Sequence, residues 1–254
     1  MSLRLRAGLL LLAVLSAAPA CVRADTNAQT QSWIALASEG LDARARAALD
    51  QIQGAERRLL ALRAYLRSGD SLAERWTWSD QRLSSYASTS EGRAAAADLD
   101  AVSAVFAREN PGYALQVNRV LRSFQQQLER WNGNPGVAQV AITLQQALRS
   151  QFGNTEAPDS AVLRRALIDW RPGTAAPLAA PGLSPHGQGR AFDFQVYSRE
   201  RLIAGTSVSS APRDWDAAGW TSRLRRAVND SGRPFVGPLR SPYEPWHYAY
   251  EPRP

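Results

Sequence analysis

Residues 184–196 read Ser-Pro-His-Gly-Gln-Gly-Arg-Ala-Phe-Asp-Phe-Gln-Val, and they predict how the chain is organised. From residue 190 to residue 197 apolar and polar side chains alternate, a pattern typical of a β-strand. The side chains of Phe192, Phe194 and Val196 would then share one face and pack against a core. Asp193 would point away from that apolar layer, as a ligand on a core strand should.

The two histidines of the chain both lie in short segments that also contain a carboxylate. His186 precedes Asp193 by seven positions, and the glycines between them allow a close turn that folds the histidine back over the strand. His247 follows Glu244 by three positions. In a straight strand these two side chains would point to opposite faces, but the neighbouring prolines predict a bent approach that brings both to one cavity.

Two imidazoles and one carboxylate are a common ligand set for a catalytic zinc ion, which keeps a fourth position open. A second carboxylate within reach supplies the proton acceptor that hydrolysis requires. The alternative is that each histidine forms only local hydrogen bonds. Because both histidines lie beside a carboxylate and a glycine or proline turn, we favour convergence at one zinc ion (Zn2+) per chain. The converging residues are His186, Asp193, His247 and Glu244.

Hydrophobic periodicity predicts helices early in the chain and strands around the histidine segments. Helices are predicted at 41–66, 90–108, 124–130, 137–152, 160–170 and 215–229. Strands are predicted at 113–121, 190–197, 202–208 and 246–250. Residues 25–35 are predicted to be a short polar leader. This order favours an α+β fold, with a small antiparallel sheet that carries the zinc site, flanking helices, and an N-terminal helical extension at 25–75.

The composition indicates a globular, basic protein. Of its 254 residues 44% are hydrophobic, which is enough for one sizeable core and an extension. All 30 basic residues are arginine, and the formal net charge is +7. Such a charge suits adsorption to anionic polymers, but we favour the simpler interpretation of a solvated surface. No nucleic-acid motif accompanies the charge, so we expect no nucleic-acid partner.

Residues 1–24 resemble a secretory signal peptide. Two arginines precede an apolar run at 9–15 that is too short to span a bilayer comfortably. Cleavage is predicted after Ala20 or after Ala24, and the second site would remove the only cysteine, Cys21. Lipid attachment to Cys21 is the alternative, but the preceding residues lack the leucine-like position of a lipoprotein signal. We therefore expect an exported periplasmic or extracellular protein without a later transmembrane segment.

Both histidine segments match motifs of one metalloenzyme family. Ser-x-His-x-x-Gly-x-Ala-x-Asp is matched at each fixed position by residues 184, 186, 189, 191 and 193. Glu-x-Trp-His is matched by residues 244, 246 and 247. Together they resemble the LAS metallopeptidases and, within that family, the VanY-like D-alanyl-D-alanine carboxypeptidases. The resemblance covers residues 90–254 and implies a zinc peptidase domain at 76–254.

A third and weaker match concerns an arginine. The family places this arginine in a Tyr-Arg-Ser segment at the end of a strand, with a glutamine five residues later. Arg122 and Gln127 fit this pattern, although Leu121 replaces the tyrosine and the preceding Ser-Gly is missing. Because of this departure, Arg119 competes with Arg122 for the same role.

The resemblance implies a role for each matched residue. Three of them bind zinc, namely His186, Asp193 and His247. Glu244 accepts a proton from the attacking water and passes it to the leaving amine. Arg122 holds the scissile carbonyl oxygen or a substrate carboxylate. Ser184 is expected to orient the motif loop or the substrate, and Trp246 to pack beneath the site.

The implied function is hydrolysis of peptidoglycan stem peptides by an exported enzyme resembling a D-alanyl-D-alanine carboxypeptidase. This substrate lies outside the cytoplasm, in agreement with the predicted signal peptide. An endopeptidase that cuts within the stem or cross-bridge is one alternative, because the family includes both activities. A zinc-containing binding module without turnover is another, as in the related hedgehog signalling domain. Retention of Glu244 argues against the binding module, since zinc affinity does not need that residue.

Overall fold

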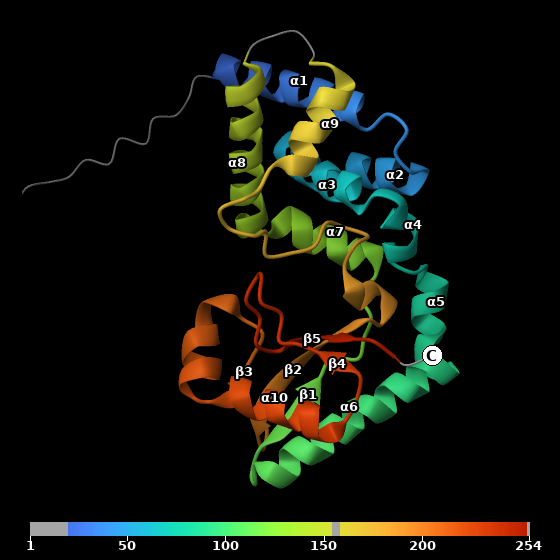
Figure 1. Cartoon of the computed structure of the whole chain (residues 1–254), viewed down its shortest axis with the longest axis vertical. Helices are drawn as coiled ribbons and strands as arrows, with labels where there is room; N and C mark the ends of the chain where they lie inside the picture. Colours follow the sequence, from blue (N-terminus) through green and yellow to red (C-terminus); the bar gives the residue numbers. More distant parts are fainter. Residues whose placement is uncertain (1–19, 154–157, 253–254) are drawn as a thin grey trace, which may run out of the picture.

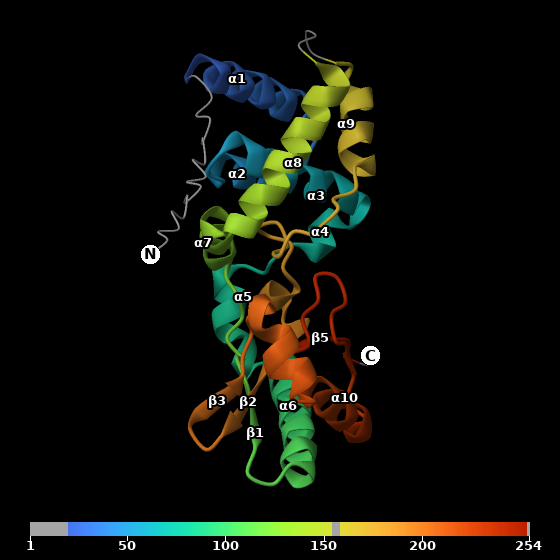
Figure 2. The ribbon, with the colours of Figure 1, turned by 90° about the vertical axis from the view of Figure 1, so that its left-hand side faces the viewer.

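The protein consists of a helical half and a sheet half, arranged along its long axis (Figure 1, Figure 2). The structure is a computed structural model that describes residues 20–153 and 158–252. Buried apolar side chains form two clusters, one in each half. The chain alternates between these clusters, so each half combines segments that are far apart in the sequence.

Six helices build the helical half in the described part of the chain. They are α1 (Ala20–Ala37), α2 (Ala43–Gln51), α3 (Ala55–Ser68), α7 (Phe124–Gly133), α8 (Pro135–Phe152) and α9 (Ser160–Asp169). Their shared core includes Trp33, Leu62, Trp131 and Leu144, each at most 1% exposed. The helices predicted as an N-terminal extension thus share one core with α7, α8 and α9, which come later in the chain.

A connection of short helices leads from α3 to the sheet half. It contains η1 (Gly69–Ser71), α4 (Leu72–Arg75), α5 (Asp80–Ser85) and η2 (Tyr86–Ser88). Trp76 stacks on Phe124 at 6.1 Å between ring centroids and packs against the helical core. Trp78 lies 5.4 Å from the Tyr86 ring and packs against the sheet-half core. The two tryptophans therefore fasten this connection to both cores.

The sheet half confirms the predicted α+β architecture. Its antiparallel strands are β1 (Ala114–Val117), β2 (Ala191–Ser198), β3 (Arg201–Ala204), β4 (Phe235–Val236) and β5 (His247–Tyr250). The central strand β2 pairs with β1 along one side and with β5 and β3 along the other. Helices α6 (Ser90–Glu109) and α10 (Trp220–Ser231) pack against each other beside the sheet (Figure 1). Three short segments complete this half, namely η3 (Pro185–Gln188), η4 (Val208–Ser210) and η5 (Pro212–Ala217).

Strand β2 shows the predicted alternation. Phe192, Phe194 and Val196 are at most 2% exposed, whereas Asp193 is only partly buried. Asp193 pairs in register with His247 of β5. Because directly opposite residues of an antiparallel pair project to the same face, this register brings the two side chains together.

Several predicted segments differ from the structure. The helix predicted at 215–229 is divided into the end of η5 and α10, with Gly219 at a φ of +77° between them. Residues 25–35 are not a polar leader but belong to α1, which buries Trp33 and Ile34 in the helical core. The apolar positions of this helix gather at its C-terminal end, so its sequence shows little periodicity. The single helix predicted at 41–66 is instead two helices, because Gly54 has a φ of +83° that a helix cannot accommodate.

Residues 1–19 of the predicted signal peptide lie outside the described residues. Its remaining residues, 20–24, form the start of α1. Across 20–153 and 158–252, no helix combines the length and the apolar character that crossing a bilayer requires.

Candidate metal centre

The loop before β2 folds His186 back over the strand, as its glycines predict. Residues Pro185–Gln188 form the 3-10 helix η3, and the Gly187 N–H closes a turn at 2.8 Å from the Ser184 carbonyl. Gly189 follows with a φ of +63°, a left-handed conformation that favours glycine. The imidazole of His186 thereby reaches the carboxylate side of β2.

A turn at the start of β5 brings Glu244 and His247 together. The His247 N–H donates to the Glu244 carbonyl at 3.1 Å, and the Glu244 N–H donates to the Leu239 carbonyl at 3.0 Å. The hydrogen bond from His247 to Glu244, three residues earlier, closes a turn of the backbone. Glu244 Oε2 consequently lies 3.6 Å from His247 Nδ1. The bent approach predicted from Pro242 and Pro245 is therefore present.

Three side chains converge on one point. His186 Nε2 lies 3.2 Å from His247 Nδ1 and 3.5 Å from Asp193 Oδ1. His247 Nδ1 lies 2.9 Å from the same carboxylate oxygen. The side chains of His186, Asp193 and His247 are only 10%, 13% and 12% exposed. This nearly buried group could hold a metal ion.

Arg122, and not Arg119, contacts this group. Arg122 Nη2 donates to Asp193 Oδ2 at 2.8 Å, while the other carboxylate oxygen faces the histidines. Arg119 instead forms an ion pair with Asp100 on α6. The structure thus adds a contact that the sequence did not predict, in which Arg122 orients the aspartate.

Gln127 of α7 fastens the histidine loop to the helical half. Its side chain is 5% exposed and uses both ends of the carboxamide. Nε2 donates to Thr77 Oγ1 at 2.7 Å, and Oε1 accepts from the N–H groups of Gly182 and Ser184 at 3.0 and 3.3 Å. Gln127, which fitted the arginine motif, therefore braces the histidine loop. Its hydrogen bonds go to other residues than the three converging side chains.

Gln188 and Gly187 complete this attachment. Gln188 Nε2 donates to the carbonyls of Glu74 and Trp76 at 2.6 and 2.7 Å. A Cβ atom at Gly187 would overlap Thr77 Oγ1 and lie 2.7 Å from the Gln127 amide, so the loop packs too closely for a side chain. Sequence reasoning missed the role of Gln188, because a neutral amide in a loop carries no distinguishing pattern.

Burial and neighbouring charges set the protonation of the group. Burial lowers the pKa of His186 to about 3, which keeps its imidazole neutral. Burial alone would raise the pKa of Asp193, but the hydrogen bond from His247 and the nearby positive charges lower it to about 2. Burial raises the pKa of Glu244, although His247 opposes the rise. A neutral imidazole and an ionised carboxylate are the forms that bind cations.

The group opens into a cavity of about 450 Å³ between the two halves. Glu244 and His247 line it from the sheet half, Arg130 of α7 lines it from the helical half, and Arg75 of α4 lines it from the connection between the halves. Residues 175–179, in the loop after α9, form an apolar wall. Arg75 and Arg130 were not predicted as site residues, because nothing distinguishes them in a chain with 30 arginines.

Ser184 and Trp246 lie beside the three converging residues. Ser184 is buried and lines the cavity. Trp246 is 2% exposed, lies 6.1 Å from the Trp215 ring, and accepts a hydrogen bond from the Phe194 N–H at its carbonyl. Ser184 thus belongs to the cavity wall and Trp246 to the core beneath it.

No protein-family model, curated protein or solved structure matches this chain, so its function has to be inferred from the motifs and the geometry of the site.

Proposed function

We propose that this protein is an exported zinc-dependent peptidase, related to the LAS metallopeptidases, that removes the terminal D-alanine from peptidoglycan stem peptides. The observation that carries the proposal is the convergence of His186, Asp193 and His247 beside Glu244. A site that only binds metal needs the first three residues. A partly buried carboxylate in the same cavity is the additional group that hydrolysis requires.

The geometry of the donor atoms fits zinc. In a tetrahedral site with bonds of about 2.05 Å, neighbouring ligand atoms lie about 3.3 Å apart. The three distances among His186 Nε2, His247 Nδ1 and Asp193 Oδ1 are 3.2, 2.9 and 3.5 Å. A zinc ion held by these two nitrogens and one oxygen would keep one position open, and the adjoining cavity would give water and substrate access to it.

Arg122 serves this site in two ways. Its contact with Asp193 Oδ2 holds the carboxylate so that Oδ1 faces the histidines, a typical arrangement around a metal ligand. Arg122 also lines the cavity, where its other N–H groups can bind the scissile carbonyl oxygen. A permanently cationic group there offsets the negative charge that develops on this oxygen during attack.

Glu244 moves the proton in the proposed reaction. When bound, zinc supplies Lewis-acid chemistry that polarises water and the scissile carbonyl group. Glu244 takes up a proton as water attacks the carbonyl carbon, and it delivers a proton to the nitrogen as the peptide bond breaks. Its raised pKa suits both steps, because the carboxyl group then releases and accepts protons closer to neutral pH. One water is consumed, and one carboxylate and one amine are formed.

Mass spectrometry of products from defined pentapeptide muropeptides tests this proposal. We expect the loss of one D-alanine when zinc is present, no reaction with a chelator, and recovery when zinc is restored. An endopeptidase would instead release fragments cut within the stem or cross-bridge. If the protein binds zinc but leaves every muropeptide intact, the peptidase proposal is wrong and a binding module is the better interpretation.

A further inference from the structure

Positive charge dominates the cavity beside the converging histidines. Its described lining holds three guanidinium groups, those of Arg75, Arg122 and Arg130, and a single carboxylate, that of Glu244. Asp193 balances Arg122 through their 2.8 Å contact. A bound divalent cation would add to the remaining positive charge. Such a cavity is suited to an anionic group on its ligand.

Arg130, unlike Arg122, has no acidic partner among the described residues. Within residues 20–153 and 158–252, its side chain forms neither an ion pair nor a hydrogen bond with protein atoms. Its side chain nevertheless belongs to the site, because Arg130 lines the same cavity as His186, Glu244 and His247. An exposed, unpaired arginine at the edge of a cavity is free to bind a carboxylate with its planar fork.

Arg75 lies in the same cavity and is only partly engaged. Its Nη1 atom donates to Ser68 Oγ at 3.2 Å, which leaves the other nitrogens available. The wall beside these arginines reads Ala175-Ala-Pro-Leu-Ala179. It offers small, uncharged surfaces, so the cavity combines a cationic part with an apolar part that suits methyl-sized side chains.

We propose that Arg130, assisted by Arg75, binds the C-terminal carboxylate of the substrate, so that the site accepts peptides ending one residue beyond the scissile bond. This inference rests on the proposed function and makes it more specific. Neither arginine lies in the histidine motifs or in the Arg122 segment. The substrate of an endopeptidase continues past the scissile bond and would place a neutral amide among these guanidinium groups. Residues of the helical half and of the connection would then determine specificity for chemistry located in the sheet half.

Binding of two probes to the Glu244→Gln variant separates recognition from hydrolysis. The probes are diacetyl-L-lysyl-D-alanyl-D-alanine and the same peptide with a C-terminal amide. We expect the free acid to bind at least about tenfold more tightly, because a hydrogen bond to a charged group contributes this much. Adding Arg130→Gln should weaken binding of the acid about tenfold and leave binding of the amide unchanged. Adding Arg75→Gln should cause a smaller loss for the acid alone.

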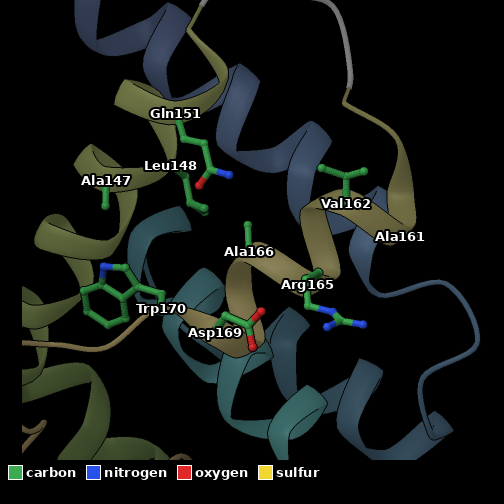
Figure 3. A pocket seen from close by; sticks show the side chains of 9 residues that line it. All are labelled: Ala147, Leu148, Gln151, Ala161, Val162, Arg165, Ala166, Asp169 and Trp170. Carbon is green, nitrogen blue, oxygen red and sulfur yellow. The ribbon is translucent and has the colours of Figure 1, made fainter.

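Arg165→Gln is the matched control. Arg165 is an exposed arginine that lines a different cavity, between α8 and α9, together with Asp169 and Trp170 (Figure 3). The same loss of charge there should leave the affinities for both probes within about twofold of the parent. The zinc content of every variant is measured in parallel, so that damage to the metal site is recognised separately.

Any of three results would overturn the inference. The acid and the amide could bind with equal affinity, the acid could fail to bind measurably, or Arg130→Gln could weaken binding of both probes equally. A third probe, with an upstream glutamate carboxylate and an amidated C-terminus, distinguishes the source of the anion. If Arg130→Gln weakens binding of that probe instead, the assignment to the C-terminal carboxylate is wrong. The proposed function fails by a different result, namely that wild-type protein loaded with zinc leaves the acid probe uncleaved.

Discussion

His186 Nε2 lies 3.2 Å from His247 Nδ1, although 61 positions separate the two residues in the chain. The η3 turn folds the first histidine back over β2, and the register of β2 with β5 sets the second opposite Asp193. Two imidazole nitrogens that face each other in a nearly buried site need a shared proton or a cation between them. A cation bound there would therefore stabilise the folded protein.

Zinc should raise the free energy of unfolding. A zinc concentration 100 times the Kd is expected to add about 2.7 kcal/mol, because the ion binds the folded state and not the unfolded chain. Asp193→Ala should abolish most of this gain, since it removes one ligand. Thermal denaturation with and without zinc measures the effect, and Asp230→Ala, on the exposed face of α10, is the control. A full zinc effect in Asp193→Ala would show that the ligand set is wrong.

Gly187→Ala should weaken zinc binding without changing any ligand. The new methyl group would meet Thr77 and the Gln127 amide 2.7 Å away, and would push the histidine loop from its place. Overpacking of this kind costs about 1–3 kcal/mol of stability. Gly173→Ala is the matched control, because a Cβ there has nothing within 4 Å. If both variants bind zinc as tightly as the wild type, the close fit of this loop is not important for the site.

The sequence was sufficient to predict the parts of the site that depend on short segments. The alternation around Asp193 predicted β2 and its buried face, and the glycine and proline turns predicted how His186 and Glu244 approach. Each of these features is decided within about ten residues by sterics and side-chain alternation.

Contacts between distant segments could not be predicted in the same way. The sequence left open whether Arg119 or Arg122 faces the site, because the answer depends on where Asp100 of α6 lies. The contribution of Arg130 depends on how α7 packs against the sheet half. Tertiary packing determines both contacts, and the local periodicity of the sequence contains no information about it.

Tyr243→Phe should slow the proposed reaction while leaving zinc bound. The Tyr243 hydroxyl donates to Asp216 Oδ1 at 2.6 Å and ties the segment that carries Glu244 to η5. Loss of this hydrogen bond should lower kcat several-fold through poorer positioning of the carboxylate. Tyr197→Phe is the control, because no hydrogen bond of the Tyr197 hydroxyl is found among the described residues. An unchanged kcat in Tyr243→Phe would exclude a positioning role.

The metal-free protein should lose stability as the pH falls below about 6.5. Burial holds the pKa of His186 at about 3 in the folded state, against 6.5 for an unperturbed histidine. Between these values the unfolded chain binds more protons, so unfolding becomes easier as the pH decreases. Thermal denaturation at pH 7, 6 and 5 should show this loss, and His186→Gln should show less of it. The same pH dependence in both proteins would contradict the assigned burial of His186.

The most direct measurement is the zinc content and the hydrolysis rate of Glu244→Gln, determined on the same preparation as the wild type. Glu244 is not among the three converging ligands, so the variant should keep about one zinc per chain. Removal of the proton acceptor should lower the rate of D-alanine release by about 100- to 10,000-fold. A variant that keeps its zinc and cleaves as fast as the wild type would contradict the assignment of Glu244 as the general base.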